Sequence, residues 1–574
     1  MAEFKRVVIT RNGQTLMAKL MSGTGTVEFT KIGVSSTTYT DAQLEALTSL
    51  SGVKQTAPIT NIARNNNASV TVEGAISNEE LTVGYYMQTI GLYAKDPDAG
   101  EILYAVTTAS VAGYMPPFNN RTPSGAQFKL TTTVGNAENV TLQIDPSAVA
   151  TIGDINRLET SLNDLQAYVG YAEKGVLGLE ADFENNKFTR LGDAVGRTPG
   201  SSFDSFSMYG GRRRVNLADN GTVNAVFGDG NYIEDGSNGQ VMVEQPAFYY
   251  KVVPLKTQPI TDGYGQNLMK ARYYISDQPR AGFKLHPAFK DHTGKTRQKV
   301  YVSAYESSIF DSSESKYLKL DEQIADFNAD KLSSIANAKP ASGVTQNLTR
   351  ENARKLANNR GQGWHQQSLS TSSMSQLLFI IEYATFNSQG ALGAGFDTDP
   401  NDNLTSARAK NTGSTQTLGN KSGSVGVEGV IFPSYRGEEN LWGNIYTVMD
   451  GFTLEGKGKN NGWYALGDYR ENGIDGSYKP FGFTIAKANG FVKYFGYSEE
   501  ADFTFIPGGT NDGANSALPV GDYFHQSNAL DGFILTRLGG DWSIGVNAGI
   551  FCWGLYTTFS YRSRGIGARL VYAP

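Results

Sequence analysis

Alternation of apolar and polar residues runs through the N-terminal part of the chain. It is clearest in residues 68–76 and 81–94. A period of two places successive side chains on opposite faces of a strand, so these segments predict half-buried β-strands. Val7–Thr10, followed by Asn12 and Gly13, predicts a strand that ends in a turn. Together the patterns predict a small, mainly β first unit.

Between residues 151 and 180 the apolar period lengthens to that of a helix. Apolar residues recur at alternating spacings of three and four, as at the a and d positions of a heptad repeat. This predicts a short coiled coil that joins copies of the chain, without deciding between dimer and trimer; Gly170 and Gly175 weaken its far end. An amphipathic helix packed on a neighbouring unit is the alternative. The seam consists of Ile155, Leu158, Leu162, Leu165, Val169, Ala172 and Val176.

Beyond residue 180 helical periodicity is confined to residues 349–386, which predict two helices. Strands are predicted at Val241–Val253 and Lys299–Phe310, and the long polar connection Ala394–Gly423 is typical of a functional loop. The predicted fold class is mainly β with some α. The predicted parts are an N-terminal module at 1–150, a coiled-coil stalk at 151–180 and a third region at 181–574.

Length and charge narrow the possible folds and partners. The chain has 574 residues, whereas a single core stops growing at roughly 250 to 300, so three or more units are expected. The net charge of -6 gives no reason to expect a nucleic-acid partner. The N-terminus has no apolar signal segment, and the longest apolar run, Leu377–Tyr383, is too short to cross a bilayer. We therefore expect synthesis in the cytoplasm and no membrane insertion.

Candidate catalytic residues are sparse. Cys552 is the only cysteine, which excludes a disulfide within the chain and a multi-cysteine metal site. Asp450 and Glu455 are candidates for the paired carboxylates of a glycan-cleaving enzyme, although both also fit a structural role. The four histidines lie in unrelated contexts without metal-ligand spacing, and each is expected to be exposed or hydrogen-bonded: His286, His292, His365 and His525. No cofactor is predicted.

Two acidic loops, residues 397–403 and 227–236, are candidates for calcium binding. The first offers closely spaced oxygens but lacks the glycine and the final glutamate of a calcium loop, with Arg408 in the last place. Asx-rich turns are the alternative, and calcium stays unsupported. The triplet Arg212–Arg214 is too short for a nucleic-acid patch and is expected to pair with carboxylates or cap a strand.

The terminal segment, Gly539–Leu570, is rich in aromatic residues although chain ends are usually mobile. Its tryptophans and Phe551 are expected in the core. Tyr556, Phe559 and Tyr561 are expected to face a partner, because threonine, serine and arginine lie among them. Tyrosine with serine, glycine and asparagine is the composition of antibody binding surfaces, since it combines rigid contact area with adaptable hydrogen bonds.

Several stretches resemble the C-type-lectin-fold domains at the tips of bacteriophage tail proteins. Those domains are similar to the variable proteins of diversity-generating retroelements and, more distantly, to formylglycine-generating enzymes. The resembling stretches are MVEQPAFYYK (242–251), RGQGWHQQ (360–367), LLFIIEYATFNSQGALGAG (377–395), SYRGEENLWGNIYTVMDGF (434–452) and the terminal segment ending in IGARLV. Residues 6–36 resemble the N-terminal attachment modules of phage tail fibres. The single cysteine cannot reproduce the chemistry of the formylglycine enzymes.

The resemblance implies roles for individual terminal residues. The framework residues would be Gly539, Gly540, Trp542, Gly545, Asn547, Gly549, Phe551, Trp553, Leu555, Ile566, Gly567, Arg569 and Leu570. The exposed receptor-binding residues, which retroelement-diversified relatives vary at adenines, would be Asp541, Ser543, Ile544, Cys552, Gly554, Tyr556, Thr557, Phe559, Tyr561, Ser563 and Gly565. Each residue type in this second set can arise from an asparagine codon by adenine changes alone.

The function implied is that of a phage tail receptor-binding protein, a virion component that acts outside the cell. Its C-terminal C-type-lectin-like α+β domain would bind a host bacterial surface receptor, either glycan or protein. Residues 1–150 would attach to the baseplate or tail, and the stalk would form a homotrimer, since tail fibres usually have threefold symmetry. A glycan-degrading tail enzyme and a passive structural tail protein are the alternatives.

Overall fold

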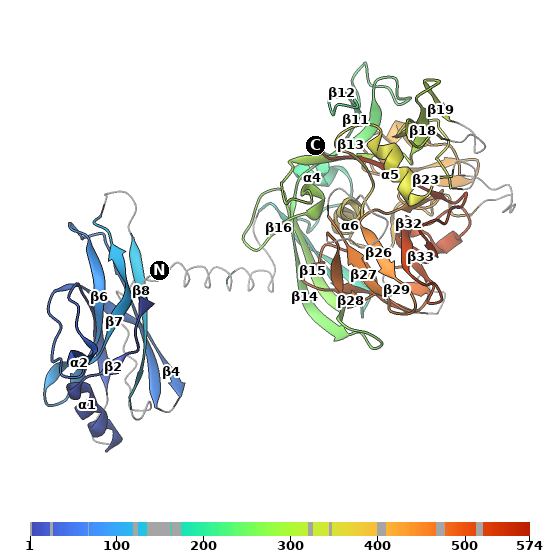
Figure 1. Cartoon of the computed structure of the whole chain (residues 1–574). Helices are drawn as coiled ribbons and strands as arrows, with labels where there is room; N and C mark the ends of the chain where they lie inside the picture. Colours follow the sequence, from blue (N-terminus) through green and yellow to red (C-terminus); the bar gives the residue numbers. More distant parts are fainter. Residues whose placement is uncertain are drawn as a thin grey trace. The chain divides into compact units, whose positions relative to one another are not determined.

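A computed structural model of the chain shows two compact units, Met1–Glu159 (unit 1) and Thr160–Pro574 (unit 2) (Figure 1). Both are mainly β, as predicted. None of the helices in the described ranges is long and apolar enough to cross a lipid bilayer. The structure describes residues 3–22, 27–66, 68–118, 124–134, 162, 174–318, 325–343, 347–398, 409–466, 477–511 and 520–574.

Unit 1 is built on one antiparallel sheet, in which the described strands follow the order β1-β7-β6-β3-β4-β5-β8, with β2 also paired to β7. Strand β5 alternates between half-buried and buried side chains along its length, which confirms the period-two prediction. The strands are β1 (Glu3–Phe4), β2 (Val8–Ile9), β3 (Glu28–Ser35), β4 (Val53–Asn66), β5 (Ser69–Ser77), β6 (Tyr85–Asp96), β7 (Gly100–Met115) and β8 (Gly125–Thr133); the helices are α1 (Arg11–Met21) and α2 (Asp41–Leu44).

The predicted turn at Asn12 and Gly13 is wrong, because α1 begins there. Thr10 caps this helix, since its hydroxyl accepts a hydrogen bond from the Gly13 backbone N–H at 3.1 Å. A Cβ on Gly13 would lie 2.1 Å from the carbonyl oxygen of Tyr104. Glycine therefore lets α1 pack closely on β7, a tertiary requirement that resembles a turn signal in the sequence.

Unit 2 contains a large sheet whose main path of described strands is β10-β9-β15-β29-β31-β33-β32-β26-β27-β28. Further strands pair at its sides: β14, β16, β25, β30 and β34. The bounds are β9 (Val176–Asp182), β10 (Lys187–Gly192), β14 (Tyr249–Pro259), β15 (Gln266–Ser276), β16 (Lys284–Leu285), β25 (Tyr446–Val448), β26 (Phe452–Glu455), β27 (Asn461–Tyr464), β28 (Lys479–Thr484), β29 (Gly490–Tyr497), β30 (Pro507–Asn511), β31 (Tyr523–Gln526), β32 (Phe533–Gly539), β33 (Gly549–Thr558) and β34 (Ile566–Gly567).

Three smaller sheets complete the described part of unit 2, with strand orders β12-β11-β13-β17-β35-β21, β19-β18-β20 and β22-β23-β24. Strand β35 lies between β17 and β21, so the chain end is held inside a sheet. The bounds are β11 (Arg213–Leu217), β12 (Val223–Val226), β13 (Gln240–Pro246), β17 (Lys299–Ser303), β18 (Ser308–Asp311), β19 (Lys316–Leu318), β20 (Lys331–Ser333), β21 (Trp364–Gln366), β22 (Gly423–Val427), β23 (Val430–Tyr435), β24 (Glu438–Glu439) and β35 (Leu570–Tyr572).

The two helices predicted within 349–386 are confirmed as α5 (Arg350–Asn358) and α6 (Leu369–Tyr383). Ser368 caps α6, and the side chains from Leu369 to Glu382 are buried. A helix that is buried on all sides belongs to the core, and Figure 1 shows α6 in the interior of the unit. Shorter helices are α4 (Ser207–Gly210) and α7 (Ser388–Leu392), with 3-10 turns η2 (Ser201–Phe203), η3 (Pro287–Phe289), η4 (Gln416–Leu418) and η5 (Gly545–Asn547).

Two predicted strands are each divided in the structure. Val241–Val253 spans β13 and β14, which belong to different sheets, and Lys299–Phe310 spans β17 and β18. The ladder between β13 and β17 ends at the pair Pro246 and Lys299. Apolar periodicity cannot reveal a change of sheet, because each new strand again contains buried apolar side chains.

The predicted coiled coil lies outside the described residues, apart from two of its positions. Leu162 is exposed. Val176 is the first residue of β9 and packs with Tyr274 in the core, so the end of the stalk predicted at 151–180 is corrected to strand from Val176 onward. Its pairing with Ser276 of β15 fixes this assignment.

Only two compact units are found where the length predicted three or more. One hydrophobic cluster of unit 2 includes Leu177 near its beginning and Ala573 near its end. Segments distant in sequence share this core because the large sheet takes strands from β9 to β34. A region that interleaves its strands in this way cannot be divided into independent domains.

Candidate functional site

The terminal segment crosses the centre of unit 2. Trp553 of β33 is fully buried and donates its Nε1–H to the carbonyl of Phe505 at 3.0 Å. Phe551 packs against the rings of Phe386 and Phe505, each at 5.4 Å between centroids. Trp542 is also buried. The prediction that these aromatic residues belong to the core is confirmed.

Four residues of the implied receptor-binding set are buried, which corrects their assignment to an exposed face: Cys552, Gly554, Thr557 and Gly565. The Cys552 thiol lies 3.7 Å from the Tyr446 hydroxyl, and burial raises its pKa far above the ordinary range. Strand β33 runs between β31 and β32, in the interior of the large sheet. The four buried residues are therefore not placed to contact a surface ligand.

Two of these glycines are required by close packing. A Cβ on Gly554 would lie 2.7 Å from Nε of Arg537, and a Cβ on Gly565 would lie 2.3 Å from Oδ2 of Asp541. Contacts under 3 Å cannot be accommodated without a shift of the neighbouring group. Variation at these positions would displace Arg537 or Asp541.

The other seven residues of the set retain contact with solvent, two of them exposed and five half-buried. Tyr561 is 42% exposed and lies in the loop 559–565 between β33 and β34. Phe559 in the same loop covers the Arg350 guanidinium, whose centre lies 3.9 Å from the ring centroid. The seven are Asp541, Ser543, Ile544, Tyr556, Phe559, Tyr561 and Ser563.

Asp541 and Ser543 form a local turn at the start of this surface. Oδ1 of Asp541 accepts hydrogen bonds from the Ser543 N–H at 3.0 Å and from its hydroxyl at 2.7 Å. Burial raises the pKa of Asp541, and the bonds from Ser543 oppose this only in part. This carboxylate is therefore occupied by its own turn.

Arg537 of β32 lies beneath these residues and was not found from the sequence. Its guanidinium carbon lies 4.6 Å from the ring centroid of Tyr446, 4.1 Å from that of Tyr556 and 5.9 Å from that of Tyr561. We call these three rings the tyrosine cage. The sequence feature that could have indicated this residue is its charge within the largely apolar stretch from Ile534 to Leu538.

His525 of β31 adjoins the cage. Its ring lies 5.7 Å from that of Tyr556 and 4.4 Å from that of Tyr523. Burial, together with the nearby charge of Arg537, lowers the pKa of His525 to about 4. The imidazole is therefore neutral near pH 7, and its Nε2 is enclosed without a hydrogen-bond partner.

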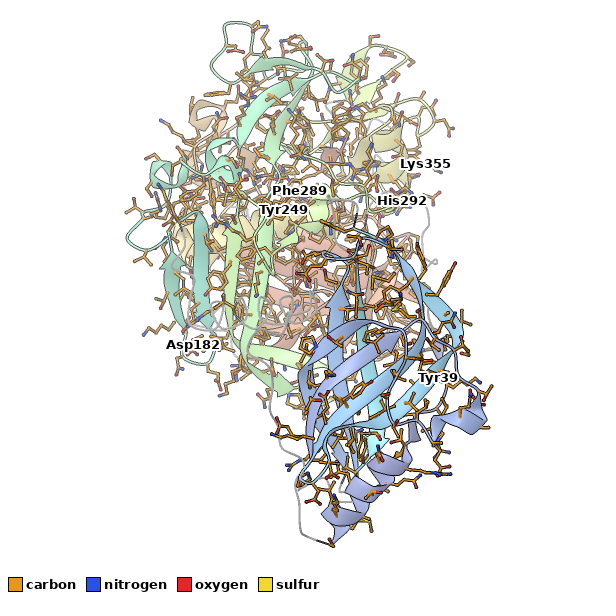
Figure 2. The ribbon with its side chains drawn as sticks, turned by 90° about the vertical axis from the view of Figure 1, so that its left-hand side faces the viewer. Tyr39, Asp182, Tyr249, Phe289, His292 and Lys355 are labelled. Carbon is orange, nitrogen blue, oxygen red and sulfur yellow. The ribbon has the colours of Figure 1, made fainter. Side chains whose placement is uncertain are left out.

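The other histidines occupy separate environments. His286 is fully buried among Phe248, Tyr250 and Phe289, and its Nδ1 accepts the Ala288 N–H at 3.3 Å. His292 is exposed (Figure 2). The described residues contain no group of three or more His, Cys, Asp or Glu that could hold a metal ion.

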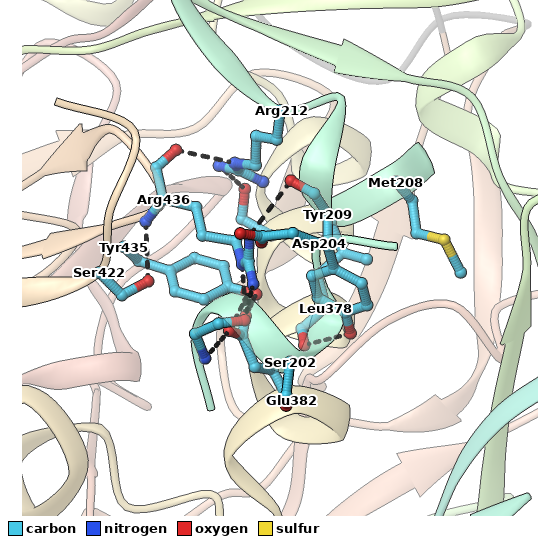
Figure 3. A network of polar contacts seen from close by, with 12 residues as sticks. Ser202, Asp204, Met208, Tyr209, Arg212, Leu378, Glu382, Ser422, Tyr435 and Arg436 are labelled. Carbon is cyan, nitrogen blue, oxygen red and sulfur yellow. Dashed lines mark hydrogen bonds and ion pairs between the residues drawn. The ribbon is translucent and has the colours of Figure 1, made fainter. Parts of the chain in front are cut away.

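The prediction that the triplet Arg212–Arg214 pairs with carboxylates is confirmed. Arg212 pairs with Glu438, Arg213 with Glu244 and Arg214 with Glu234. A neighbouring network has the same character (Figure 3): both oxygens of Glu382 on α6 accept from Arg436, at 2.7 and 2.8 Å. The Glu382–Arg436 pair is buried and connects α6 to the turn that follows β23.

The two candidate catalytic carboxylates are already engaged. Asp450 is buried and binds Arg354 through both oxygens, at 2.8 and 2.6 Å. Glu455 pairs with Lys459. These ion pairs give both carboxylates the structural role that is the predicted alternative.

Of the two candidate calcium loops, only residues 227–236 are described in full. Most of 397–403 lies outside the described residues. In 227–236, Asp229 accepts the Val226 N–H at 3.0 Å and Asp235 accepts the Ser237 N–H at 2.9 Å. The bond to Asp235 is that of an Asx turn, the alternative predicted for this loop.

The N-terminal part of the chain has a match among known families. Residues 1–153 match the family model of the phage tail-collar fibre protein, N-terminal. No curated protein matches the sequence. Among solved structures the chain is similar to two variants of one protein, the Major Tropism Determinant U1 and P3c variants.

The similarity to these two structures is distant. Both are 12% identical to this chain and cover 63% of it, with 72% of the U1 variant and 71% of the P3c variant aligned. The TM-scores are 0.22 and 0.21. Similarity at this level carries no inference about unit 2, whose description rests on its own geometry.

Proposed function

We propose that the chain is a receptor-binding protein of a phage tail. Unit 1 attaches to the tail or baseplate, and unit 2 binds a molecule on the host bacterial surface. The observation that carries this proposal is the match of residues 1–153 to the tail-collar fibre family. If the chain is attached to the virion through its N-terminal unit, the larger unit 2 is free to bind the host cell surface.

Within unit 2, the binding surface is the solvent-facing part of the terminal segment, centred on Tyr561 with Ser543, Tyr556 and Phe559. Supporting this choice are the exposure of Ser543 and Tyr561 and the support from buried Arg350 and Arg537 beneath the rings. Aromatic rings on a rigid β scaffold provide contact area at low entropic cost. Binding needs no reaction, and the engaged state of Asp450 favours an adhesin over a glycan-cleaving enzyme.

The test is binding of the fluorescently labelled full chain to bacterial strains that differ in surface glycans. We expect saturable binding to a subset of strains and its loss in Tyr561→Ala. Tyr264→Ala is the matched control, because Tyr264 is a similarly exposed tyrosine elsewhere in unit 2, at 45% against 42%. Binding to no strain, or equal loss in both variants, would contradict the proposal. Release of sugar products would contradict the pure adhesin.

A further inference from the structure

Arg537 occupies an unusual position in the large sheet. Its strand pairs with β33 at Gly554 and with β25 at Val448. The side chain passes directly over Gly554, where a Cβ would lie 2.7 Å from Nε and 2.9 Å from Cγ. The absence of a side chain at Gly554 therefore creates the space that holds the guanidinium.

The charge of Arg537 has no partner in the described structure. The residue is only 3% exposed, yet it donates no hydrogen bond and forms no ion pair within the described residues, and its Nε is enclosed. Other buried arginines of unit 2 do have hydrogen-bond acceptors. Arg212, Arg214, Arg354 and Arg436 pair with Glu438, Glu234, Asp450 and Glu382, and Arg350 and Arg569 donate to backbone carbonyls. A buried charge without a partner is strongly unfavourable, so an arginine left in this state indicates a missing anion.

Contact with the tyrosine cage offsets part of the cost of burying the Arg537 charge. The cage faces solvent on the side of Tyr561. Tyr446 is buried on the inner side, whereas Tyr561, the most distant ring at 5.9 Å, is 42% exposed. Cation–π contact stabilises the guanidinium through its faces but satisfies none of its N–H donors. Those donors lie in the plane of the guanidinium group, at the edges that the tyrosine faces leave uncovered.

Groups around the cage limit the charge that the site can accept. Asp541 lies near Arg537 but forms no ion pair with it and is bound to Ser543. Neutral His525 and the Cys552 thiol complete the polar surroundings. One unpaired cation close to one carboxylate suits a monoanion better than the dianion of a phosphate monoester.

We propose that Arg537 binds the carboxylate of an acidic sugar of the hexuronate class, with Tyr556 and Tyr561 packed against the sugar ring. The planar guanidinium fork matches a carboxylate through two parallel hydrogen bonds. Tyrosine rings provide apolar faces for the C–H groups of the sugar, and access requires displacement of the exposed Tyr561 ring. This inference rests on the proposed function and specifies its ligand.

The experiment titrates the full chain with sodium glucuronate, with glucose and with inorganic phosphate at matched ionic strength, by calorimetry. We expect saturable glucuronate binding in the millimolar range, as for a single sugar, and glucose weaker by about tenfold or more. Arg537→Gln is expected to lose about tenfold or more in affinity, and Arg537→Lys is expected to be intermediate because it keeps charge without the fork. Arg562→Gln removes an exposed charge from the same loop and should bind within about twofold of the natural chain.

Near-ultraviolet circular dichroism of each variant checks its folding. If Arg537→Gln does not fold, Tyr561→Ala provides the second measurement, since it should weaken glucuronate binding with an unchanged melting temperature. Equal affinity for glucose and glucuronate, undiminished binding in Arg537→Gln, or phosphate binding without glucuronate binding would each overturn the inference.

Failure of this inference is distinguishable from failure of the proposed function. A folded Arg537→Gln chain that still binds cells like the natural chain contradicts the acidic-sugar site and leaves the receptor-binding role intact. A natural chain that binds glucuronate but no cells contradicts the proposed function alone.

Discussion

Trp553 shows at the scale of one residue why the chain end is ordered. Its ring lies 5.3 Å from that of Phe452, and its indole N–H is satisfied by a backbone carbonyl. A fully buried indole with its polar atom paired contributes both apolar burial and a buried hydrogen bond. The terminal segment is therefore fixed by its framework residues, and the exposed residues between them depend on that framework.

Replacing Trp553 should unfold unit 2 more readily. We expect Trp553→Ala to lower the free energy of unfolding by about 3–5 kcal/mol, the cost of removing a large buried aromatic ring. Urea denaturation measures this change. Val546→Ala, in the same segment but 61% exposed, is the control and should stay within about 0.5 kcal/mol. Similar stability in both variants would show that the indole is not part of the core.

His286 makes stability depend on pH. Burial lowers its pKa to about 3, whereas an unfolded histidine titrates near about 6.5. The unfolded state thus binds a proton that the folded state excludes, so this residue reduces the free energy of unfolding as pH falls from about 6.5 towards 3. In His286→Phe we expect the free energy of unfolding to fall less steeply as the pH is lowered over this range. Urea denaturation at several pH values measures this dependence. An unchanged slope would contradict the assignment; His292→Phe, at an exposed position, is the matched control.

At the scale of elements, the two long helices of unit 2 are easier to predict from the sequence than the bounds of its strands. α5 and α6 are recognisable from their period and from the caps Thr349 and Ser368. The division of Val241–Val253 between two sheets cannot be recognised from the sequence, because the strands that pair with each half lie far away in the chain. The Arg537 cage was missed for the same reason: it exists only where β25, β32 and β33 meet.

The contact between β32 and β33 can be tested by a double-mutant cycle. Gly554→Ala should destabilise unit 2, because its methyl group would overlap the Arg537 side chain, whereas Arg537→Ala creates space for it. We therefore expect Gly554→Ala to cost less in the Arg537→Ala background, with a coupling energy of roughly 0.5–3 kcal/mol. Additive effects in thermal or urea unfolding would show that the two residues do not compete for space.

At the scale of the whole molecule, the assembly state is still a prediction. The apolar seam from Ile155 to Ala172 favours a coiled coil, and we expect a homotrimer in solution. Several copies would raise weak single-site affinity through avidity, by about two to four orders of magnitude when the sites bind together. Light scattering or native mass spectrometry at micromolar concentration measures the mass. A monomer would remove both the stalk and the avidity.

The division of the terminal segment into exposed and buried residues leads to a prediction about specificity. If the proposed surface binds the receptor, then replacing Ser543 and Tyr561 should change which strains are bound while the melting temperature holds, because exposed substitutions cost within about 0.5 kcal/mol. Replacing Cys552 or Thr557 with larger residues should lower the melting temperature, because both are enclosed between strands. Retroelement diversification, if it acts on this chain, should therefore leave variation at the exposed positions and little at Gly554 or Gly565. Sequencing this segment in related phages that infect different strains measures the distribution. Variation concentrated at the buried positions would contradict the proposed surface.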